Sequence, residues 1–159
     1  MPKGIAMVLL DSNLFIVDRF FPRDSLYPQN RRFMDQVGSI EAGISVITLL
    51  EVCGAAAFRL TTRELESWLF RFSAIYPVHV LDVHGVTGKE ADVWWNTFVA
   101  EVSENISKKM TFGDALLLRE AEKYAADAII TWNTKDFSRR THLPVQTPSA
   151  FLKGIETRT

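Results

Sequence analysis

Cysteine is almost absent from this chain. Cys53 is the single cysteine among 159 residues, which excludes an internal disulfide and fits a reducing compartment such as the cytoplasm. A nucleophilic thiol needs a cationic neighbour that lowers its pKa, whereas Cys53 lies two residues from Glu51 in an otherwise apolar stretch. We therefore expect Cys53 to belong to the core.

Long hydrophobic runs are also missing. The longest apolar window, residues 44–58, contains Glu51 and is shorter than the ~20 residues that span a bilayer. The first residues include Lys3 and a short apolar run broken at Asp11, without the small-residue cleavage pattern of a secretory signal. We expect a cytoplasmic protein with no membrane segment.

An excess of positive charge is absent as well. Lys and Arg number 18 and Asp and Glu 19, so the net charge is −1 and there is no overall basic field to attract nucleic acid. Any nucleic-acid contact must then use local groups of cations. The length suits one domain, residues 1–159, with a core from about residue 6 to 147 and a short C-terminal helix over 148–155.

Apolar runs alternate with segments of helical periodicity along the whole chain. The runs predict strands at residues 6–10, 43–46, 78–83, 128–131 and 144–147. Helices are predicted at 12–21, 29–37, 47–60, 61–76, 89–102 and 113–126, with a polar loop at 104–112. This order predicts an α/β fold with three layers, α/β/α, around a mostly parallel central sheet of four to five strands.

Asp11 stands at the end of the first predicted strand. In an open α/β sheet the carboxyl ends of the strands are where ligands bind. The alternative is that Asp11 or Ser12 only caps the following helix, because Asp and Ser are favoured capping residues. The rest of the chain has to distinguish the two.

Three further acidic residues occupy unexpected positions. Glu51 falls in an apolar helical stripe formed by positions 47, 50, 51, 54 and 58, where a carboxylate is costly unless it reaches solvent or pairs with a cation such as Arg59. Asp114 begins a helix whose face continues through apolar residues, although aspartate is also favoured there by the helix dipole. Asp136 follows the fourth strand, where Asp136 and Asn133 are also ordinary turn residues.

One sheet carries all four acidic residues toward the same edge, which we call the acidic edge. Carboxylates gathered in a dry cleft repel one another unless a cation joins them, and ligands that are all oxygen suit Mg²⁺ or Mn²⁺. Such ions, held by carboxylates, catalyse phosphoryl transfer.

Four short motifs that contain these residues occur in a recognisable order. They are VLLDSN at 8–13, SVITLLE at 45–51, GDALL at 113–117 and ITWNTKDF at 130–137. In this order and at about these spacings, the sequence resembles the PIN-domain ribonucleases, most of all the VapC-type toxins of toxin–antitoxin pairs. The resemblance covers residues 8–137 and implies a PIN-like fold and Mg²⁺- or Mn²⁺-dependent cleavage of RNA that leaves 5′-phosphate and 3′-hydroxyl ends.

The resemblance also implies roles for particular residues. Asp11, Glu51 and Asp114 would be metal ligands, with Asp136 as the fourth acidic residue and Asn133 assisting or replacing it. The residues that would orient these ligands or a water are Ser12, Asn13 and Thr131. Cations near the acidic edge that are candidates for phosphate contacts, or else simply solvated, are Lys108, Lys109, Lys135, Arg139 and Arg140. The implied partners are RNA, an antitoxin whose peptide lies across the active-site groove, and a second copy in a homodimer.

Other classes fit less well or remain as alternatives. A phosphatase of the haloacid-dehalogenase type needs a second aspartate two residues after the first, where this chain has Asn13. A response-regulator receiver needs an acidic pair and a late lysine that are not in place. A housekeeping PIN-type RNA-processing nuclease and a non-catalytic PIN-like RNA- or protein-binding module remain as alternatives.

Overall fold

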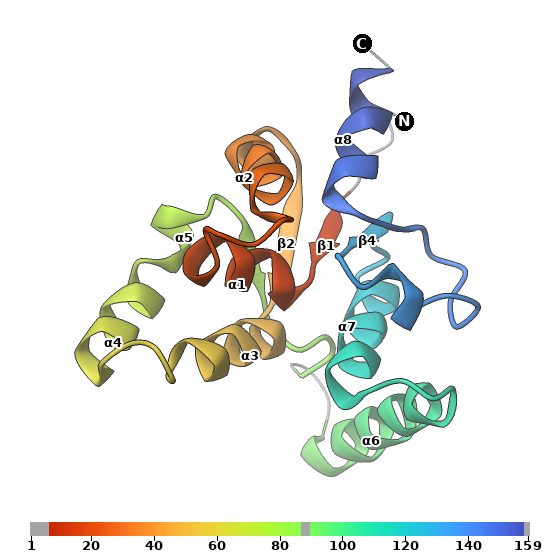
Figure 1. The fold of residues 1–159 in the computed structure, drawn as a ribbon. Coiled ribbons are helices and arrows are strands. Elements are labelled where there is room, and N and C mark those ends of the chain that lie inside the picture. Colours follow the sequence, from red (N-terminus) through yellow and green to blue (C-terminus); the bar gives the residue numbers. More distant parts are fainter. Residues whose placement is uncertain (1–6, 87–89, 158–159) are drawn as a thin grey trace.

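A five-stranded, all-parallel sheet forms the centre of the molecule, whose computed structural model describes residues 7–86 and 90–157 (Figure 1). The strand order is β3-β2-β1-β4-β5. The strands are β1 (Val8–Leu10), β2 (Ala42–Ser45), β3 (His79–Leu81), β4 (Ala128–Ile130) and β5 (Val145–Gln146). They fall within a few residues of the runs that predicted them.

Helices cover both faces of this sheet, which confirms the predicted α/β/α layers. One face carries α1 (Ser12–Phe20), α2 (Tyr27–Gln36), α3 (Val46–Ala56), α4 (Thr62–Phe70), α5 (Phe72–Ile75) and α8 (Pro148–Glu156). The other carries α6 (Ala91–Ser107) and α7 (Phe112–Lys123). Short 3₁₀ turns, η1 (Val37–Ser39) and η2 (Thr134–Asp136), complete the described elements.

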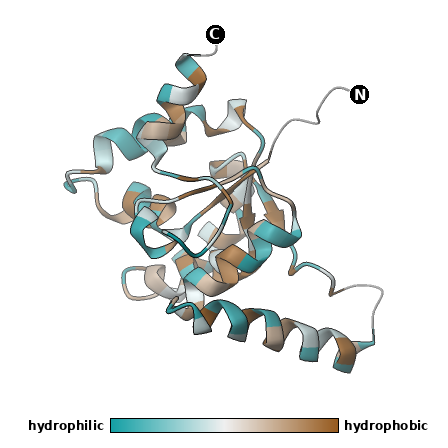
Figure 2. Ribbon diagram, turned by 90° about the vertical axis from the view of Figure 1, so that its right-hand side faces the viewer, coloured by the Kyte–Doolittle hydropathy of each residue, from teal (hydrophilic) through white to brown (hydrophobic). Residues whose placement is uncertain are grey.

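The central strands β1 and β4 are apolar on both sides because both sides are covered. Val8 and Leu10 point into the core under α1 and α3, whereas Leu9 between them points into the core under α7. Ile129 and Ile130 alternate in the same way on β4. Figure 2 shows the consequence, with hydrophobic strands enclosed by helices of mixed hydropathy.

The chain changes direction at β1. It runs outward from β1 through β2 to β3 and then returns to the other side of β1 to form β4 and β5. The carboxyl ends of β1 and β4 therefore flank the switch point of the sheet, where open α/β proteins bind their ligands. Asp11 and Thr131 are the residues that follow these two strands.

Two helices differ from their predicted extents. The segment predicted as one helix over 61–76 is divided at Arg71 into α4 and α5; the predicted capping box of Thr61 and Glu64 is present at its start. Helix α6 continues through residues 104–107, which were predicted as loop, because one side of its last turns is buried against α7 through Val102 and Asn105. Of the polar residues there, Glu104 and Ser107 occupy the solvent side and Asn105 the buried side.

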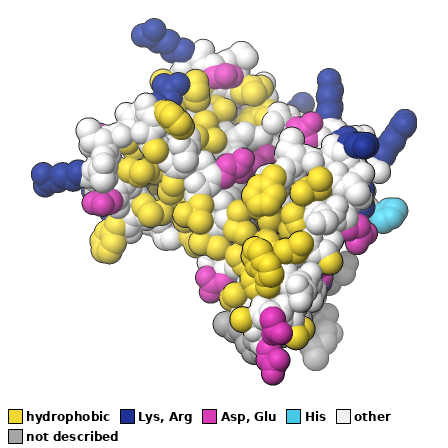
Figure 3. Space-filling model, turned by 90° about the horizontal axis from the view of Figure 1, so that it is seen from below, with side chains coloured by type: hydrophobic (Ala, Val, Ile, Leu, Met, Phe, Trp, Pro, Cys, Tyr) yellow, Lys and Arg dark blue, Asp and Glu magenta, His cyan; other side chains and the backbone are white. Residues whose placement is uncertain are grey.

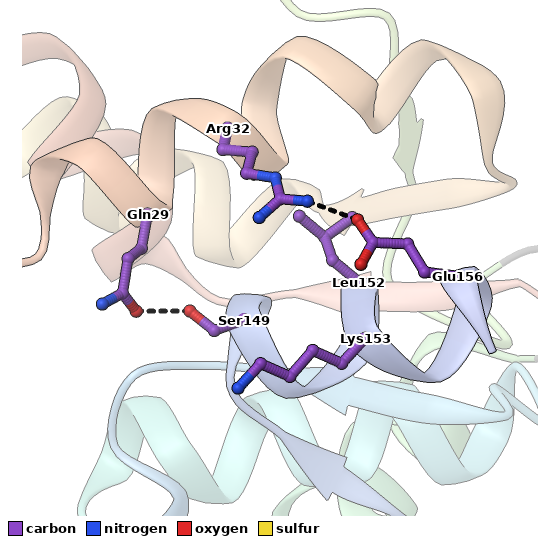
Figure 4. A pocket seen from close by; sticks show the side chains of 6 residues that line it. All are labelled: Gln29, Arg32, Ser149, Leu152, Lys153 and Glu156. Atoms are coloured by element: carbon purple, nitrogen blue, oxygen red, sulfur yellow. Dashed lines mark hydrogen bonds and ion pairs between the residues drawn. The ribbon is translucent and has the colours of Figure 1, made fainter.

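Helix α8 packs against α2 far along the chain. Arg32 of α2 pairs with Glu156 of α8, and the Ser149 hydroxyl donates to the Gln29 side chain, at a cavity of about 250 Å³ (Figure 4). Beneath these polar contacts Leu152 is buried in the core. This helix therefore closes the domain over residues 148–156, as predicted.

The remaining composition-based expectations concern Cys53 and the membrane. Cys53 is partly buried and packs against the core, and burial raises the pKa of its thiol, so the prediction of a packing role is confirmed. In the described part of the chain, no helix is long and apolar enough to cross a bilayer.

Candidate functional site

Asp11 is held rigidly where β1 ends. Its side chain is only 7% exposed. One carboxylate oxygen accepts from the Ser12 N–H at 2.7 Å, and the other accepts from Thr131 Oγ1 at 2.7 Å and Asn13 Nδ2 at 2.9 Å. Asp11 is thus the cap of α1, as the capping alternative predicted, but its second carboxylate oxygen is held by the neighbouring strand end and by Asn13.

Glu51 lies on the open side of α3 rather than in a buried stripe. The buried side of α3 consists of Thr48, Leu49, Val52 and Ala56, whereas the face formed by positions 47, 50, 51, 54 and 58 is largely exposed, with Leu50 59% and Phe58 93% exposed. Of the alternatives that the sequence left open for Glu51, the structure shows the one in which the carboxylate reaches solvent; a buried position in an apolar stripe is wrong. The stripe is an exposed hydrophobic surface beside the acidic edge. Because Glu51 reaches solvent there, its carboxylate needs no buried partner.

Asp114 sits in the first turn of α7 and faces Glu51. Thr111 Oγ1 donates to Asp114 Oδ2 at 2.7 Å, and the Asp114 N–H is 3.3 Å from the same hydroxyl, so Asp114 also takes part in capping α7. The intervening Gly113 leaves room for Glu51, because a Cβ at position 113 would lie 3.0 Å from Glu51 Oε1. The predicted inward face is confirmed for Leu117, Leu118 and Ala121, which are buried, but it was wrong for Ala125, which is exposed just after α7 ends.

Asp136 lies at the rim. It belongs to the exposed turn η2, whereas Asn133 is held to the end of β4 by its N–H, which donates to Thr131 Oγ1 at 3.0 Å. Asp136 interacts electrostatically with Asp114 and raises the pKa of that group. The geometry thus places Asp136 next to the acidic residues, on the side of Asp114.

The acidic side chains influence one another's protonation. Burial raises the pKa of Asp11 from 3.8 to about 6, the hydrogen bond from Thr131 opposes this shift, and the charges of Glu51 and Asp114 add to it. Burial likewise raises the pKa of Glu51, even though the residue is exposed as a whole, and the Ser12 hydroxyl lowers it. The pKa of Asp114 is raised by burial and by Asp136, and lowered by Thr111 and Arg140.

These residues form a donor set for a hard divalent cation, although they are not gathered into a shell. Within residues 7–86 and 90–157, no three His, Cys, Asp or Glu side chains stand close enough together to hold a metal ion as they are. Asp11 and Asp114 are fixed by hydrogen bonds, whereas Glu51 is more exposed and interacts with the Ser12 hydroxyl. An oxygen-only set fits Mg²⁺ or Mn²⁺ better than zinc.

The predicted cations divide into two groups. Arg140 is occupied by the backbone, because its guanidinium donates to the carbonyls of Lys108 at 2.8 Å and Asp136 at 2.7 Å. Lys108 Nζ bonds Asn105 Oδ1 at 3.0 Å. By contrast, Lys109, Lys135 and Arg139 are exposed. Arg140 therefore joins the loop before α7 to the η2 turn, a structural role that the sequence did not suggest.

Two buried asparagines that support the site were missed by sequence reasoning. The Asn30 side chain donates to the Leu14 carbonyl at 2.8 Å and accepts from the Trp132 indole at 2.8 Å, which ties α1 to the segment after β4. Asn105 Nδ2 donates to the Ala115 carbonyl at 3.2 Å, which fixes α6 to the start of α7. The sequence signal that could have identified Asn30 and Asn105 is a polar residue on the inward-facing side of a predicted helix.

Hydrophobic side chains flank the acidic edge. Figure 3 shows acidic side chains near the middle of the lower face, with hydrophobic side chains on either side. Helices α3, α6 and α7 and the turn after α3 carry large exposed apolar residues, namely Leu50, Phe58, Val93, Trp95, Val99, Ile106 and Phe112. So much exposed apolar surface on a small domain is typical of an interaction site.

The parallel sheet, its switch point and its helical layers define a three-layer, PIN-like α/β/α protein. The same fold occurs in a chain of VapBC2 from Rickettsia felis bound to a DNA fragment from their promoter, with 16% identity, a TM-score of 0.62, and coverage of 89% of this chain and 98% of that one. It occurs also in DNA-bound VapBC from Salmonella typhimurium, with 19% identity, a TM-score of 0.60, and coverage of 91% and 99%.

A toxin–antitoxin complex from Klebsiella pneumoniae contains a third similar chain, with 20% identity, a TM-score of 0.53, and coverage of 89% and 97%. No protein-family model and no curated protein sequence matches this chain. The resemblance to VapC-type PIN domains is thereby confirmed at the level of the fold.

Proposed function

We propose that this chain is a metal-dependent endoribonuclease and the toxin of a toxin–antitoxin pair. The observation that carries the proposal is Asp11, a buried carboxylate at the switch point whose pKa is raised to about 6 partly by Glu51 and Asp114. A protein keeps mutually repelling carboxylates in such a place at a cost in stability, which is typical of functional sites. The similar chains in toxin–antitoxin and VapBC complexes support the choice of this class.

Asp11, Glu51 and Asp114 would hold the ion, with Asp136 or Asn133 at the rim. When bound, Mg²⁺ or Mn²⁺ supplies charge neutralisation at the scissile phosphate and a water activated for attack. Thr131 and Asn13 keep the Asp11 carboxylate in one orientation, and Thr111 does the same for Asp114. Ser12, between Asp11 and Glu51, orients both carboxylates.

The exposed apolar surface supports a proposal for the protein partners of this chain. We propose that the exposed apolar residues of α3, α6 and α7 contact other polypeptides, an antitoxin across the acidic edge and a second copy of this chain. The single cysteine supports a cytoplasmic location. A small antitoxin gene directly upstream would favour the toxin over a housekeeping nuclease.

The proposal is tested by incubating the purified chain with RNA in Mg²⁺ or Mn²⁺ and, separately, with chelator. We expect cleavage that requires the metal. Asp11→Asn and Asp114→Asn should each reduce cleavage to background while circular dichroism shows that the fold survives.

Asp127→Asn provides the matched control, because Asp127 is an exposed aspartate after α7 and away from the acidic edge. It should cleave as the wild type does. Full activity in Asp11→Asn or Asp114→Asn would contradict the assignment of the site.

A further inference from the structure

A second polar feature lies at the opposite end of α1 from Asp11. Residues of α1, α4 and the α4–α5 junction line a surface depression of about 380 Å³. Its polar lining consists of Arg19, Arg63, Glu64, Ser67, Trp68 and Arg71. We call this feature the arginine depression.

Positive charge in the arginine depression is not balanced. Three guanidinium groups face one carboxylate, and in the described ranges none of Arg19, Arg63 and Arg71 forms a salt bridge. Glu64 is engaged in the helix cap, where it accepts from the Thr61 N–H at 2.8 Å and the Thr61 hydroxyl at 2.7 Å. Its pKa is lowered by these bonds, so it stays ionised and offsets one guanidinium.

The remaining polar group is also a donor. Trp68 is 6% exposed, and its buried indole N–H has no hydrogen-bond acceptor among the described residues. Buried donors without an acceptor are rare in folded proteins, and a bound ion or water often satisfies a donor that the chain itself does not. Guanidinium groups only donate, and the Ser67 hydroxyl can donate as well, so the depression matches an anion that accepts several hydrogen bonds.

We propose that the arginine depression binds a backbone phosphate of the RNA substrate, at a distance from the acidic edge. This inference rests on the proposed function. Arg19 lies eight residues after Asp11 along α1, which at 1.5 Å per residue separates them by about 12 Å along the helix axis. An RNA strand that reaches the acidic edge is long enough to span that separation.

Phosphate is the anion that the molecule needs to hold here. The acidic edge repels the RNA backbone, and the guanidinium of Arg140 beside it is already bonded to backbone carbonyls. With a net charge of −1, affinity for RNA has to come from a local group of cations. The planar fork of arginine suits phosphate oxygens better than a lysine does.

The test measures RNA binding apart from cutting. A fluorescein-labelled 20-nucleotide single-stranded RNA of random sequence is titrated with the full chain in chelator, and anisotropy is recorded at several KCl concentrations. The variant Arg63→Gln/Arg71→Gln should bind about tenfold more weakly near 0.1 M salt, and the salt dependence of its affinity should flatten by about 1.4 log units per log unit, or ~0.7 for each lost phosphate contact.

The matched control is Arg32→Gln, which removes the same kind of charge from α2 beside α8 (Figure 4). It should keep wild-type affinity. Equal RNA affinity for the wild type and the double variant would overturn the inference. Poly-glutamate is titrated in the same way as a second probe. If the double variant keeps its RNA affinity but loses binding to poly-glutamate, the inference also fails, because the depression would then bind an acidic polypeptide.

Failure of this inference and failure of the proposed function give different results. RNA that is bound through the arginines but never cut with Mn²⁺ removes the nuclease and leaves the phosphate site. If RNA is cut with Mn²⁺ but is bound equally well by the double variant, the nuclease stands and the phosphate site is removed.

Discussion

The two sides of the acidic edge are built in opposite ways. On the sheet side, Asp11 is 7% exposed and accepts hydrogen bonds from groups that follow β1 and β4. On the helical side, Glu51 and Asp136 are exposed and lie on a helix face and a short turn. The difference teaches that the core fixes the position of Asp11 at the cost of burying charge, whereas Glu51 and Asp136 lie on exposed elements.

On the sheet side, the buried Asp11 should make the free energy of unfolding depend on pH. Because the pKa of Asp11 is raised from 3.8 to about 6, the folded chain holds this proton more tightly than the unfolded chain does. The free energy of unfolding of the wild type should therefore fall as pH rises through about 4 to 6. Asp11→Asn does not titrate there, so in chelator it should gain up to about 3 kcal/mol over the wild type between pH 4 and 7.

Urea denaturation at several pH values measures this gain. Asp127→Asn, on the exposed surface, should show no pH-dependent gain. A gain for Asp11→Asn that shrinks as pH rises would contradict the raised pKa. Added Mn²⁺ should stabilise the wild type and not the variant, because only the wild type binds the ion.

The hydrogen bond from Thr131 to Asp11 across the switch point should have the second-largest effect, on metal affinity. Thr131→Val keeps the shape of the side chain but removes the donor to Asp11. We expect Mn²⁺ affinity, measured by isothermal titration calorimetry, to fall about 10- to 100-fold, which is typical for the loss of a group that orients a ligand. The control is Thr97→Val on α6, where the hydroxyl bonds only the Val93 carbonyl. Equal losses in both variants would refute a specific role for Thr131.

Substitutions on the helical side of the acidic edge should have smaller effects than those on the sheet side. In Gly113→Ala the new Cβ lies 3.0 Å from Glu51 Oε1, and the exposed Glu51 side chain can move away. Mn²⁺ affinity should fall a few-fold with little change in the melting temperature. Gly54→Ala, with nothing within 4 Å of its Cβ, should keep wild-type affinity and gain up to about 1 kcal/mol. A large loss of stability in Gly113→Ala would mean that Glu51 is as rigid as Asp11.

Sequence reasoning found the sheet side because its signals are local. An apolar run that ends in Asp11 predicts both a buried strand and a group at its carboxyl end. The helical side was harder, since periodicity shows that positions share a face of α3 but not whether that face meets the core or solvent. The sequence therefore identified Glu51 as unusual but did not decide between a buried carboxylate and one that reaches solvent.

Other features depend on tertiary contacts that no local pattern carries. Arg140 looked like a free cation, but the chain folds so that carbonyls from two loops surround its guanidinium. The arginine depression unites Arg19 with Arg63 and Arg71, which lie more than forty residues further along the chain. The end of α6 was predicted as loop because its residues are mostly polar, and the inward one among them, Asn105, is held by a tertiary hydrogen bond to the Ala115 carbonyl.

The hydrogen bond between Thr131 and Asp11 joins residues 120 positions apart in the chain. During synthesis, a ribosome-bound chain that carries only β1, β2 and β3 has Asp11 and Glu51 but not the partner that orients Asp11, nor Asp114 until α7 has emerged. The acidic edge is completed only when β4 inserts beside β1, a pairing of high sequence separation that is slow to form. Residues up to Thr131 must therefore leave the ribosome before the acidic edge can form.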